Sequence, residues 1–218
     1  SSSRTNLNIP EAQQNLIREL MKTGKPVVLV LFTGRPLTLQ WEEKNVPAIL
    51  NIWFPGTEAG YAVTDVLFGD VNPSGKLTAT FPQNVGQIPI YYSHKNTGRP
   101  LPEGKWFSKF TSNYLDVSNE PLYPFGFGLS YTHFDYQQLE ITPDPKIYGS
   151  VHVSVELKNI GSRKGTETVQ LYIRDLVGSI TRPVKELKAF KKVELLPNET
   201  RKVMFTLNLD DFRFYNPE

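Results

Sequence analysis

The spacing of apolar residues changes along this chain. The first third contains continuous apolar runs, whereas apolar and polar residues alternate in the last third. Residues 27–32 (VVLVLF) and 48–53 (AILNIW) are short apolar runs, typical of strands covered on both faces in a parallel sheet. From Phe134 onward apolar and polar residues alternate, as they do in strands with one buried face. The sequence therefore predicts an α/β region followed by an all-β region.

Two helices are expected beside the apolar runs. Residues 10–23 carry an apolar stripe at helical spacing and end at Gly24. Residues 57–69 form the second helix, which ends near Gly69. We expect this helix to bury the side chains of Ala62, Val63, Val66 and Leu67.

The α/β pattern is too short for a complete domain. A third strand is predicted over residues 76–81, reached through a turn at Asn72-Pro73-Ser74-Gly75. Two or three parallel strands leave open sheet edges that other elements must cover. We therefore expect only part of an α/β sandwich domain.

The alternating region predicts an antiparallel β-sandwich of the immunoglobulin-like kind. Its apolar positions recur over residues 151–157, 169–173, 190–195 and 203–209, with turn sequences at 159–162 and 197–199. About five strands can be counted, whereas an immunoglobulin-like sandwich has about seven. We therefore expect the sandwich to be incomplete at its C-terminal end.

A third kind of sequence lies between these two regions. Residues 82–132 are rich in Pro, Gly, Asn, Ser and aromatic residues, and their periodicity fades. Disordered linkers lack aromatic residues, which favours an ordered connector packed on a neighbouring surface. The predicted boundaries are 1–95 for the α/β part, 96–132 for the connector and 133–218 for the sandwich.

Composition excludes several classes of function. The net charge is +2 and its cations are scattered, which argues against a nucleic-acid partner. No apolar run approaches the about 20 residues of a membrane span. Cysteine is absent and the three histidines lie far apart, so we expect no metal site and no cofactor.

Several segments, taken in order, resemble one enzyme family. They are residues 9–17 (IPEAQQNLI), 24–30 (GKPVVLV), 34–37 (GRPL), 53–60 (WFPGTEAG), 65–77 (DVLFGDVNPSGKL) and 123–132 (YPFGFGLSYT). In this order they resemble the second domain of family 3 glycoside hydrolases and the start of that family's C-terminal fibronectin type III-like domain. Residues 88–100 resemble in particular its periplasmic bacterial β-glucosidases.

The resemblance implies a retaining β-glucosidase that acts on terminal non-reducing β-D-glucosyl residues. Such an enzyme uses one carboxylate as nucleophile and a second as acid/base. In the family, the nucleophilic Asp lies on a barrel domain, and the acid/base Glu lies shortly before the helix at residues 10–23. Residues 1–7 contain no acid. We therefore expect both carboxylates upstream of Ser1, no catalytic residue in this chain, and no activity from the chain alone.

The same resemblance implies partners and a location for the parent protein. The expected partners are β-glucosides or short oligosaccharides and the N-terminal barrel domain. A homodimer through the open sheet edges is a further expectation. The parent would be periplasmic or secreted.

Five residues are candidates for contacts beside the substrate. By resemblance, Ser2, Ser3 and Arg4 directly follow the acid/base, and Arg4 could orient it or pair with its charge. His94 and Arg99 lie in the aromatic connector, where they could contact sugar.

Other interpretations compete with these. Glu58 and Asp65 are seven residues apart on one predicted helix, but solvated helix acids are far commoner than a catalytic pair. Trp41 and Trp106 could stack on sugar rings, although a structural role is the default for tryptophan. A non-catalytic carbohydrate-binding or scaffold module is the alternative function.

Overall fold

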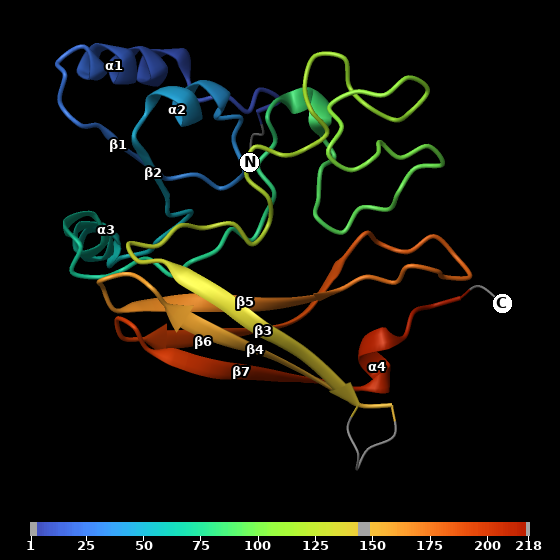
Figure 1. Cartoon of the computed structure of the whole chain (residues 1–218). Coiled ribbons are helices and arrows are strands. Elements are labelled where there is room, and N and C mark those ends of the chain that lie inside the picture. The colour runs from blue at the N-terminus through green and yellow to red at the C-terminus, as the bar shows by residue number, and fades with distance from the viewer. Residues whose placement is uncertain (1–3, 144–148, 217–218) are drawn as a thin grey trace. The chain divides into compact units, whose positions relative to one another are not determined.

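The computed structural model describes residues 4–143 and 149–216, which form two compact units (Figure 1). Among these described residues, unit 1 comprises 4–62, 77–92 and 97–127, and unit 2 comprises 63–76, 93–96, 128–143 and 149–216. Unit 1 contains helices and a parallel strand pair, and unit 2 is mainly antiparallel sheet. The mixed fold class is confirmed, whereas the domain boundaries at residues 95 and 132 stay predictions.

Unit 1 is built on a strand–helix–strand crossover. Helix α1 (Glu11–Met21) precedes β1 (Val28–Leu31), and α2 (Gln40–Asn45) connects β1 to β2 (Ala48–Asn51). The two strands pair in parallel, which requires a crossover connection, and α2 supplies it. Sequence periodicity missed α2 because six residues make less than two helical turns.

Gly24 ends the first helical segment, as predicted, in the left-handed region at φ +69°. A β-carbon at this position would meet no atom within 4 Å, so only the backbone conformation opposes a larger residue. Gly24→Ala should therefore lower the free energy of unfolding by about 1 kcal/mol, measured by urea denaturation. Gly60→Ala is the control of opposite sign, because that glycine lies in a helix with equally open space and alanine favours helix there.

The core of unit 1 gathers side chains from its helices, strands and loops. Its buried apolar members are Ile9, Ile17, Leu31, Leu39, Val46 and Phe81. Phe81 is 1% exposed, and its ring centroid lies 5.7 Å from that of Trp53 and 6.3 Å from that of Tyr123. Trp41 packs against this core beneath the Arg18 guanidinium, which confirms its structural role.

The strand predicted over residues 76–81 is wrong. The backbone N–H of Leu77 donates to the carbonyl of Phe127, and that of Phe81 donates to Tyr123, each at 2.8 Å. Bends occupy residues 78–79 between these two contacts. Backbone hydrogen bonds thus hold only the two ends of the segment, so it does not form a regular strand.

The predicted burial of the second helix is also wrong. Helix α3 (Ala59–Phe68) buries none of its residues: Val63 and Val66 are half-buried, and Ala62 and Leu67 are exposed. An apolar stripe is buried only where another element packs on it, and periodicity does not reveal that element. The predicted end is confirmed, since Gly69 follows at φ +85°.

A buried glutamine orders the irregular chain around the 3₁₀ helix η1 (Val85–Gln87). The side chain of Gln87 accepts a hydrogen bond from the N–H of Gln83 at 2.6 Å and donates to the carbonyls of Ser118 and Glu120. Gln87 is buried. One side chain thus fixes two loops that are more than thirty residues apart in sequence.

Unit 2 contains the β-sandwich that alternation predicted. Its strands are β3 (Phe134–Pro143), β4 (Val151–Asn159), β5 (Gly165–Ile173), β6 (Glu186–Leu195) and β7 (Thr200–Leu207), followed by helix α4 (Leu209–Phe212). The antiparallel sheets β3-β4-β7 and β5-β6 form two layers (Figure 1). Buried residues of both sheets, including Val169, Leu195 and Phe205, make one core between them.

Buried Asn159 closes the predicted turn after β4. Its side-chain oxygen accepts from the Thr132 hydroxyl at 2.7 Å and from the N–H of Gly161 at 3.1 Å. Its amide donates to the carbonyls of Arg163 and Leu195. These four bonds satisfy a fully buried polar side chain and tie both sheets to the chain that enters β3.

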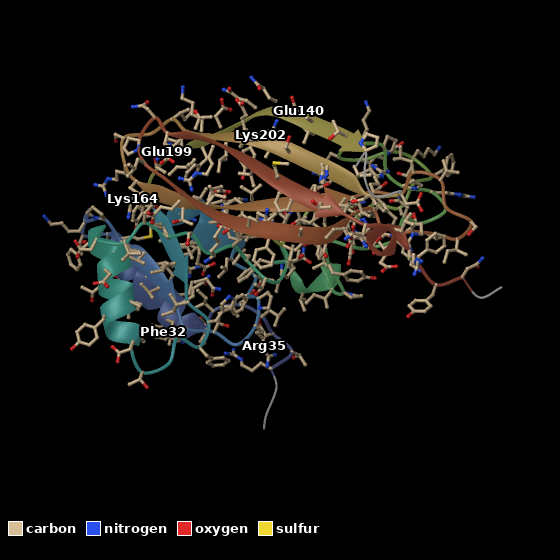
Figure 2. All side chains as sticks on the ribbon, turned by 90° about the horizontal axis from the view of Figure 1, so that it is seen from below. Phe32, Arg35, Glu140, Lys164, Glu199 and Lys202 are labelled. Carbon is tan, nitrogen blue, oxygen red and sulfur yellow. The ribbon has the colours of Figure 1, made fainter. Side chains whose placement is uncertain are left out.

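An ion pair on the outer face of the sandwich is expected to make stability depend on pH (Figure 2). Lys202 Nζ lies 2.6 Å from the Glu140 carboxylate. This hydrogen bond and charge, with a weaker bond from Ser154, hold the pKa of Glu140 below its usual 4.5. The pKa of Glu140 is lower in the folded state than in the unfolded state. The contribution of this carboxylate to folding stability is therefore fully present above the unfolded-state pKa and is lost as pH falls through the folded-state pKa.

We expect Glu140→Gln to be less stable than the wild type at pH 7 and to differ less from it near pH 3. Thermal midpoints measured at the two pH values check this. A difference in thermal midpoint between wild type and variant that stays constant or grows at the lower pH would contradict the assigned ion pair.

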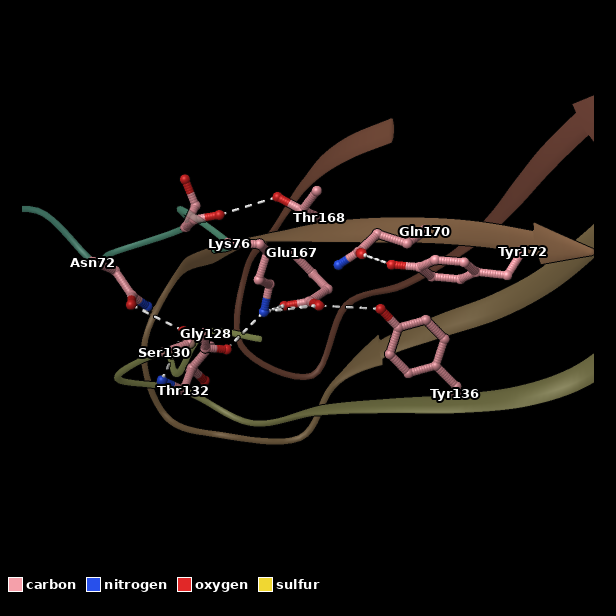
Figure 3. Close-up of polar contacts among 11 residues, drawn as sticks. Asn72, Lys76, Gly128, Ser130, Thr132, Tyr136, Glu167, Thr168, Gln170 and Tyr172 are labelled. Carbon is pink, nitrogen blue, oxygen red and sulfur yellow. Dashed lines mark hydrogen bonds and ion pairs between the residues drawn. The ribbon is translucent and has the colours of Figure 1, made fainter. Parts of the chain in front are cut away.

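The turn before Lys76 is held to the sandwich in unit 2 (Figure 3). The Asn72 amide donates to the carbonyl of Lys164 at 3.0 Å, and its oxygen accepts from the Ser130 hydroxyl and the N–H of Tyr131. The Thr168 hydroxyl donates to the carbonyl of Ser74 at 3.0 Å. The Asn-Pro-Ser-Gly sequence is therefore a docking segment as well as a turn.

A largely buried ion pair completes this attachment. Lys76 Nζ lies 3.2 Å from the Glu167 carboxylate and donates to the carbonyl of Gly128 at 2.8 Å. The Tyr136 hydroxyl donates to the same carboxylate at 3.1 Å (Figure 3). Burial first, and then the charge and hydrogen bond of Glu167, raise the pKa of Tyr136, so the phenol stays a donor.

Candidate functional site

The candidate site lies at the carboxyl ends of the parallel strands of unit 1, where α/β sheets place their ligands. Phe32 to Arg35 follow β1, and Trp53 and Phe54 follow β2. Phe32 and Phe54 are strongly exposed, and Figure 2 labels Phe32 and Arg35. The backbone of Trp53 lies in the left-handed region at φ +51°, a conformation that is uncommon for a bulky residue.

Hydrogen bonds hold residues 4–8 beside this edge. Arg35 Nη1 donates to the carbonyl of Arg4 at 3.0 Å, and the N–H of Thr38 donates to the carbonyl of Leu7 at 3.0 Å. The Thr38 hydroxyl donates to the side chain of Asn8. The chain around Arg4 is thus fixed against the loop that follows β1.

A shallow pocket of about 290 Å³ lies in the same unit. It is lined by Leu7, Arg35, Pro36, Thr80, Pro82, Ile88, Pro89, Ile90 and Tyr91. The peptide bond between Ile88 and Pro89 is cis. Most of the wall is apolar, and Arg35, Thr80 and Tyr91 are the lining residues that carry polar side-chain groups. A few polar groups among apolar ones are common in small-molecule sites.

The five predicted substrate-adjacent residues have different surroundings. Ser2 and Ser3 lie outside the described residues. Arg4 is exposed, and its carbonyl is held by Arg35. His94 is exposed in unit 2, where its carbonyl accepts from the N–H of Val184, and Arg99 is exposed in unit 1, where its carbonyl accepts from Ser112. Their roles stay predictions.

Sequence reasoning missed Arg35, Leu7 and Tyr91 as members of one site. Arg35 and Tyr91 do occur in segments that carried the family resemblance. The pocket, however, joins four stretches of chain from Leu7 to Tyr91, and only the fold brings them together.

The acids of the second predicted helix lie apart from this pocket's lining. Glu58 is exposed just before α3, and Asp65 is half-buried within that helix. In the part of the chain that the structure describes, no group of three His, Asp or Glu side chains could hold a metal ion. Among the same residues, no helix combines the length and apolar character needed to cross a bilayer.

Residues 1–131 match the family model described as the glycosyl hydrolase family 3 C-terminal domain. This chain belongs to glycosyl hydrolase family 3. Residues 167–218 of the family 3 chain match the fibronectin type III-like domain, which agrees with the sandwich in unit 2. The resemblance read from the ordered segments is confirmed.

The family 3 chain also resembles named relatives along almost its whole length. It is 51% identical to a periplasmic beta-glucosidase of Salmonella typhimurium, covering 100% of this chain and 28% of that protein. It is 42% identical to a beta-xylosidase of Formosa agariphila, covering 99% of this chain and 29% of that protein.

A solved structure agrees with these relatives. The beta-glucosidase of Listeria innocua in complex with isofagomine superposes with a TM-score of 0.89 at 47% identity, covering 97% of this chain and 30% of that one. The family 3 chain therefore spans less than a third of the length of these relatives.

Proposed function

We propose that this chain is the C-terminal part of a retaining β-glucosidase that removes terminal non-reducing β-D-glucosyl residues. The supporting observation is the 51% identity to the Salmonella periplasmic beta-glucosidase across the whole chain. The name of that relative also supports a periplasmic or secreted location for the whole protein. The N-terminal barrel domain is its expected intramolecular partner, and a homodimer through the open sheet edges is part of the proposal.

Catalysis would need two carboxylates that the family resemblance assigns to residues outside this chain. In a retaining mechanism one carboxylate attacks the anomeric carbon while the other protonates the leaving oxygen and later activates water. The chain alone is therefore expected to be inactive. Its own contribution would be the pocket beside Arg4 and Arg35, where donors and an apolar wall orient the part of the substrate next to the acid/base.

β-Xylosidase activity is the second candidate, because a Formosa agariphila relative of that name is 42% identical. The full-length protein assayed with p-nitrophenyl β-glucoside and β-xyloside separates the two. A higher kcat/KM for the glucoside supports the proposal, and a higher value for the xyloside contradicts it. Carbohydrate binding without hydrolysis of either substrate would favour the alternative of a non-catalytic module.

Removing the guanidinium of Arg35 should impair the full-length enzyme. Arg35→Ala deletes a pocket donor and the bond that holds the carbonyl of Arg4. Hydrogen bonds from charged groups contribute about 1.5–3 kcal/mol, so we expect kcat/KM for the aryl glucoside to fall by about 10- to 100-fold. The matched control is Arg213→Ala, which removes an exposed arginine paired with Asp210. Equal kinetics of both variants would rule out the assigned role of the pocket.

A further inference from the structure

Thr38 is a buried threonine that bonds a distant part of unit 1. It lies between β1 and α2 and is 7% exposed. Its hydroxyl donates to the side-chain oxygen of Asn8, and its N–H donates to the carbonyl of Leu7 at 3.0 Å. Threonine hydroxyls commonly bond backbone groups a few residues away. A bond to a side chain 30 residues away is instead a specific tertiary contact.

The two stretches that meet at this contact are both anchored in the core of unit 1. Ile9 follows Asn8 and is 7% exposed, and Leu39 follows Thr38 and is 1% exposed. The N–H of Asn8 also donates to the side-chain oxygen of Asn6 at 2.8 Å. Because packed cores deform little, the contact has a fixed base on both sides. It therefore holds the chain before Asn8 in a defined place.

The stretches that Thr38 joins supply part of the pocket wall. Leu7 lines the pocket from one stretch, and Arg35 and Pro36 line it from the other. Arg35 Nη1 adds a third bond between the stretches, to the carbonyl of Arg4 at 3.0 Å. Arg35 is exposed and Thr38 is buried, so water competes less for the bonds of Thr38. We therefore expect Thr38 to be important for the position of Leu7.

We propose that Thr38 is a positioning residue for the pocket, where its two bonds keep Leu7 and the chain before it in place for a bound substrate. This inference rests on the proposed function, in which the pocket orients the part of the substrate next to the acid/base. Thr38 is not one of the residues that line the pocket, so it acts through Leu7. An orienting contact of this kind affects kcat, because it sets the geometry in which the substrate reacts.

Thr38→Val in the full-length protein removes the hydroxyl and keeps the shape of the side chain. One neutral hydrogen bond changes an equilibrium by about threefold to tenfold, so kcat/KM for an aryl β-glucoside should fall by that factor, through kcat. Thr38→Ser keeps a hydroxyl and should recover most of the wild-type value. The matched control is Thr168→Val, which removes a similarly buried hydroxyl that bonds the carbonyl of Ser74 in unit 2. Its kinetics should equal those of the wild type.

Hydrogen exchange tests the contact without any substrate. Thr38→Val keeps the N–H at position 38, which bonds the carbonyl of Leu7. If the hydroxyl secures this bond, that N–H should exchange about threefold to tenfold faster in the variant. Asn8→Leu removes the acceptor of the same hydroxyl and should have the same effect. Combining the two changes should add little, whereas additive effects would contradict a shared bond.

Wild-type kinetics of Thr38→Val, or equal kinetics of Thr38→Val and Thr38→Ser, would overturn the positioning role. An equal loss of kcat/KM in Thr168→Val would also overturn it, because general destabilisation would then explain the loss. Hydrolysis of the aryl β-glucoside by the wild type tests the proposed function by itself. Failure of that function and failure of the Thr38 contact are therefore distinguishable.

Discussion

Replacing Lys76 with methionine should lower the free energy of unfolding of unit 2 by about 3 kcal/mol. The side chains of Lys76 and Glu167 are only 14% and 12% exposed. Without the ammonium, the Glu167 carboxylate keeps the Tyr136 hydroxyl but stays buried without a counter-charge. Urea denaturation followed by hydrogen exchange in β5 would measure the loss.

Two controls identify the cause of this loss. Changing Lys76 to Met and Glu167 to Leu together replaces both charges with apolar groups, and such replacements are often near neutral, so much of the stability should return. Lys164→Ala breaks an exposed pair with Glu194 and should cost about 0–1 kcal/mol. If the double variant lost as much free energy of unfolding as the two single variants together, the ion pair would not explain the loss.

Phe81→Ala should destabilise unit 1 by about 3–5 kcal/mol, because it empties the centre of a packed core. The ring is buried between Trp53 and Tyr123, so the cavity would be lined by aromatic side chains. Denaturation followed by tryptophan fluorescence reports on the loss and on movement of Trp53.

The control for this cavity is a ring of the same kind on the surface. Phe32 is 65% exposed, so Phe32→Ala should change the stability by less than about 0.5 kcal/mol. If Phe81→Ala cost no more than Phe32→Ala, the assigned core of unit 1 would be wrong.

Alternation predicted the sandwich well because each strand encodes its own buried face. In β7, Val203, Phe205 and Leu207 are buried, and the residues between them are exposed. The turns could also be placed, since Asn198 adopts φ +63° where the sequence indicated a reversal. These features depend on neighbouring residues in the chain.

The errors concern features that depend on distant partners. Residues 76–81 have the composition of a strand, but their partner, residues 123–127, bonds only the two ends of the segment. Helix α3 has an apolar stripe, yet its burial depends on which element packs against it. A local sequence pattern indicates which secondary structure a segment favours, but it does not show which other segments pack against it.

The site residues were hardest to predict for the same reason. Arg35 becomes a candidate only when the fold brings it to Arg4 and the pocket. The pair of Lys76 and Glu167 joins positions 91 residues apart. The family resemblance indicated the general chemistry, but it did not reveal these contacts.

A comparison of the full-length protein with the 218-residue chain on an aryl β-glucoside, with the sugar product followed by proton NMR, tests the proposed retaining β-glucosidase activity. We predict that the full-length protein releases β-glucose first, as retention requires, and that the chain alone shows no turnover. Release of α-glucose first would contradict retention, and turnover by the chain after mass spectrometry has excluded full-length contaminant would contradict the placement of both carboxylates outside this chain.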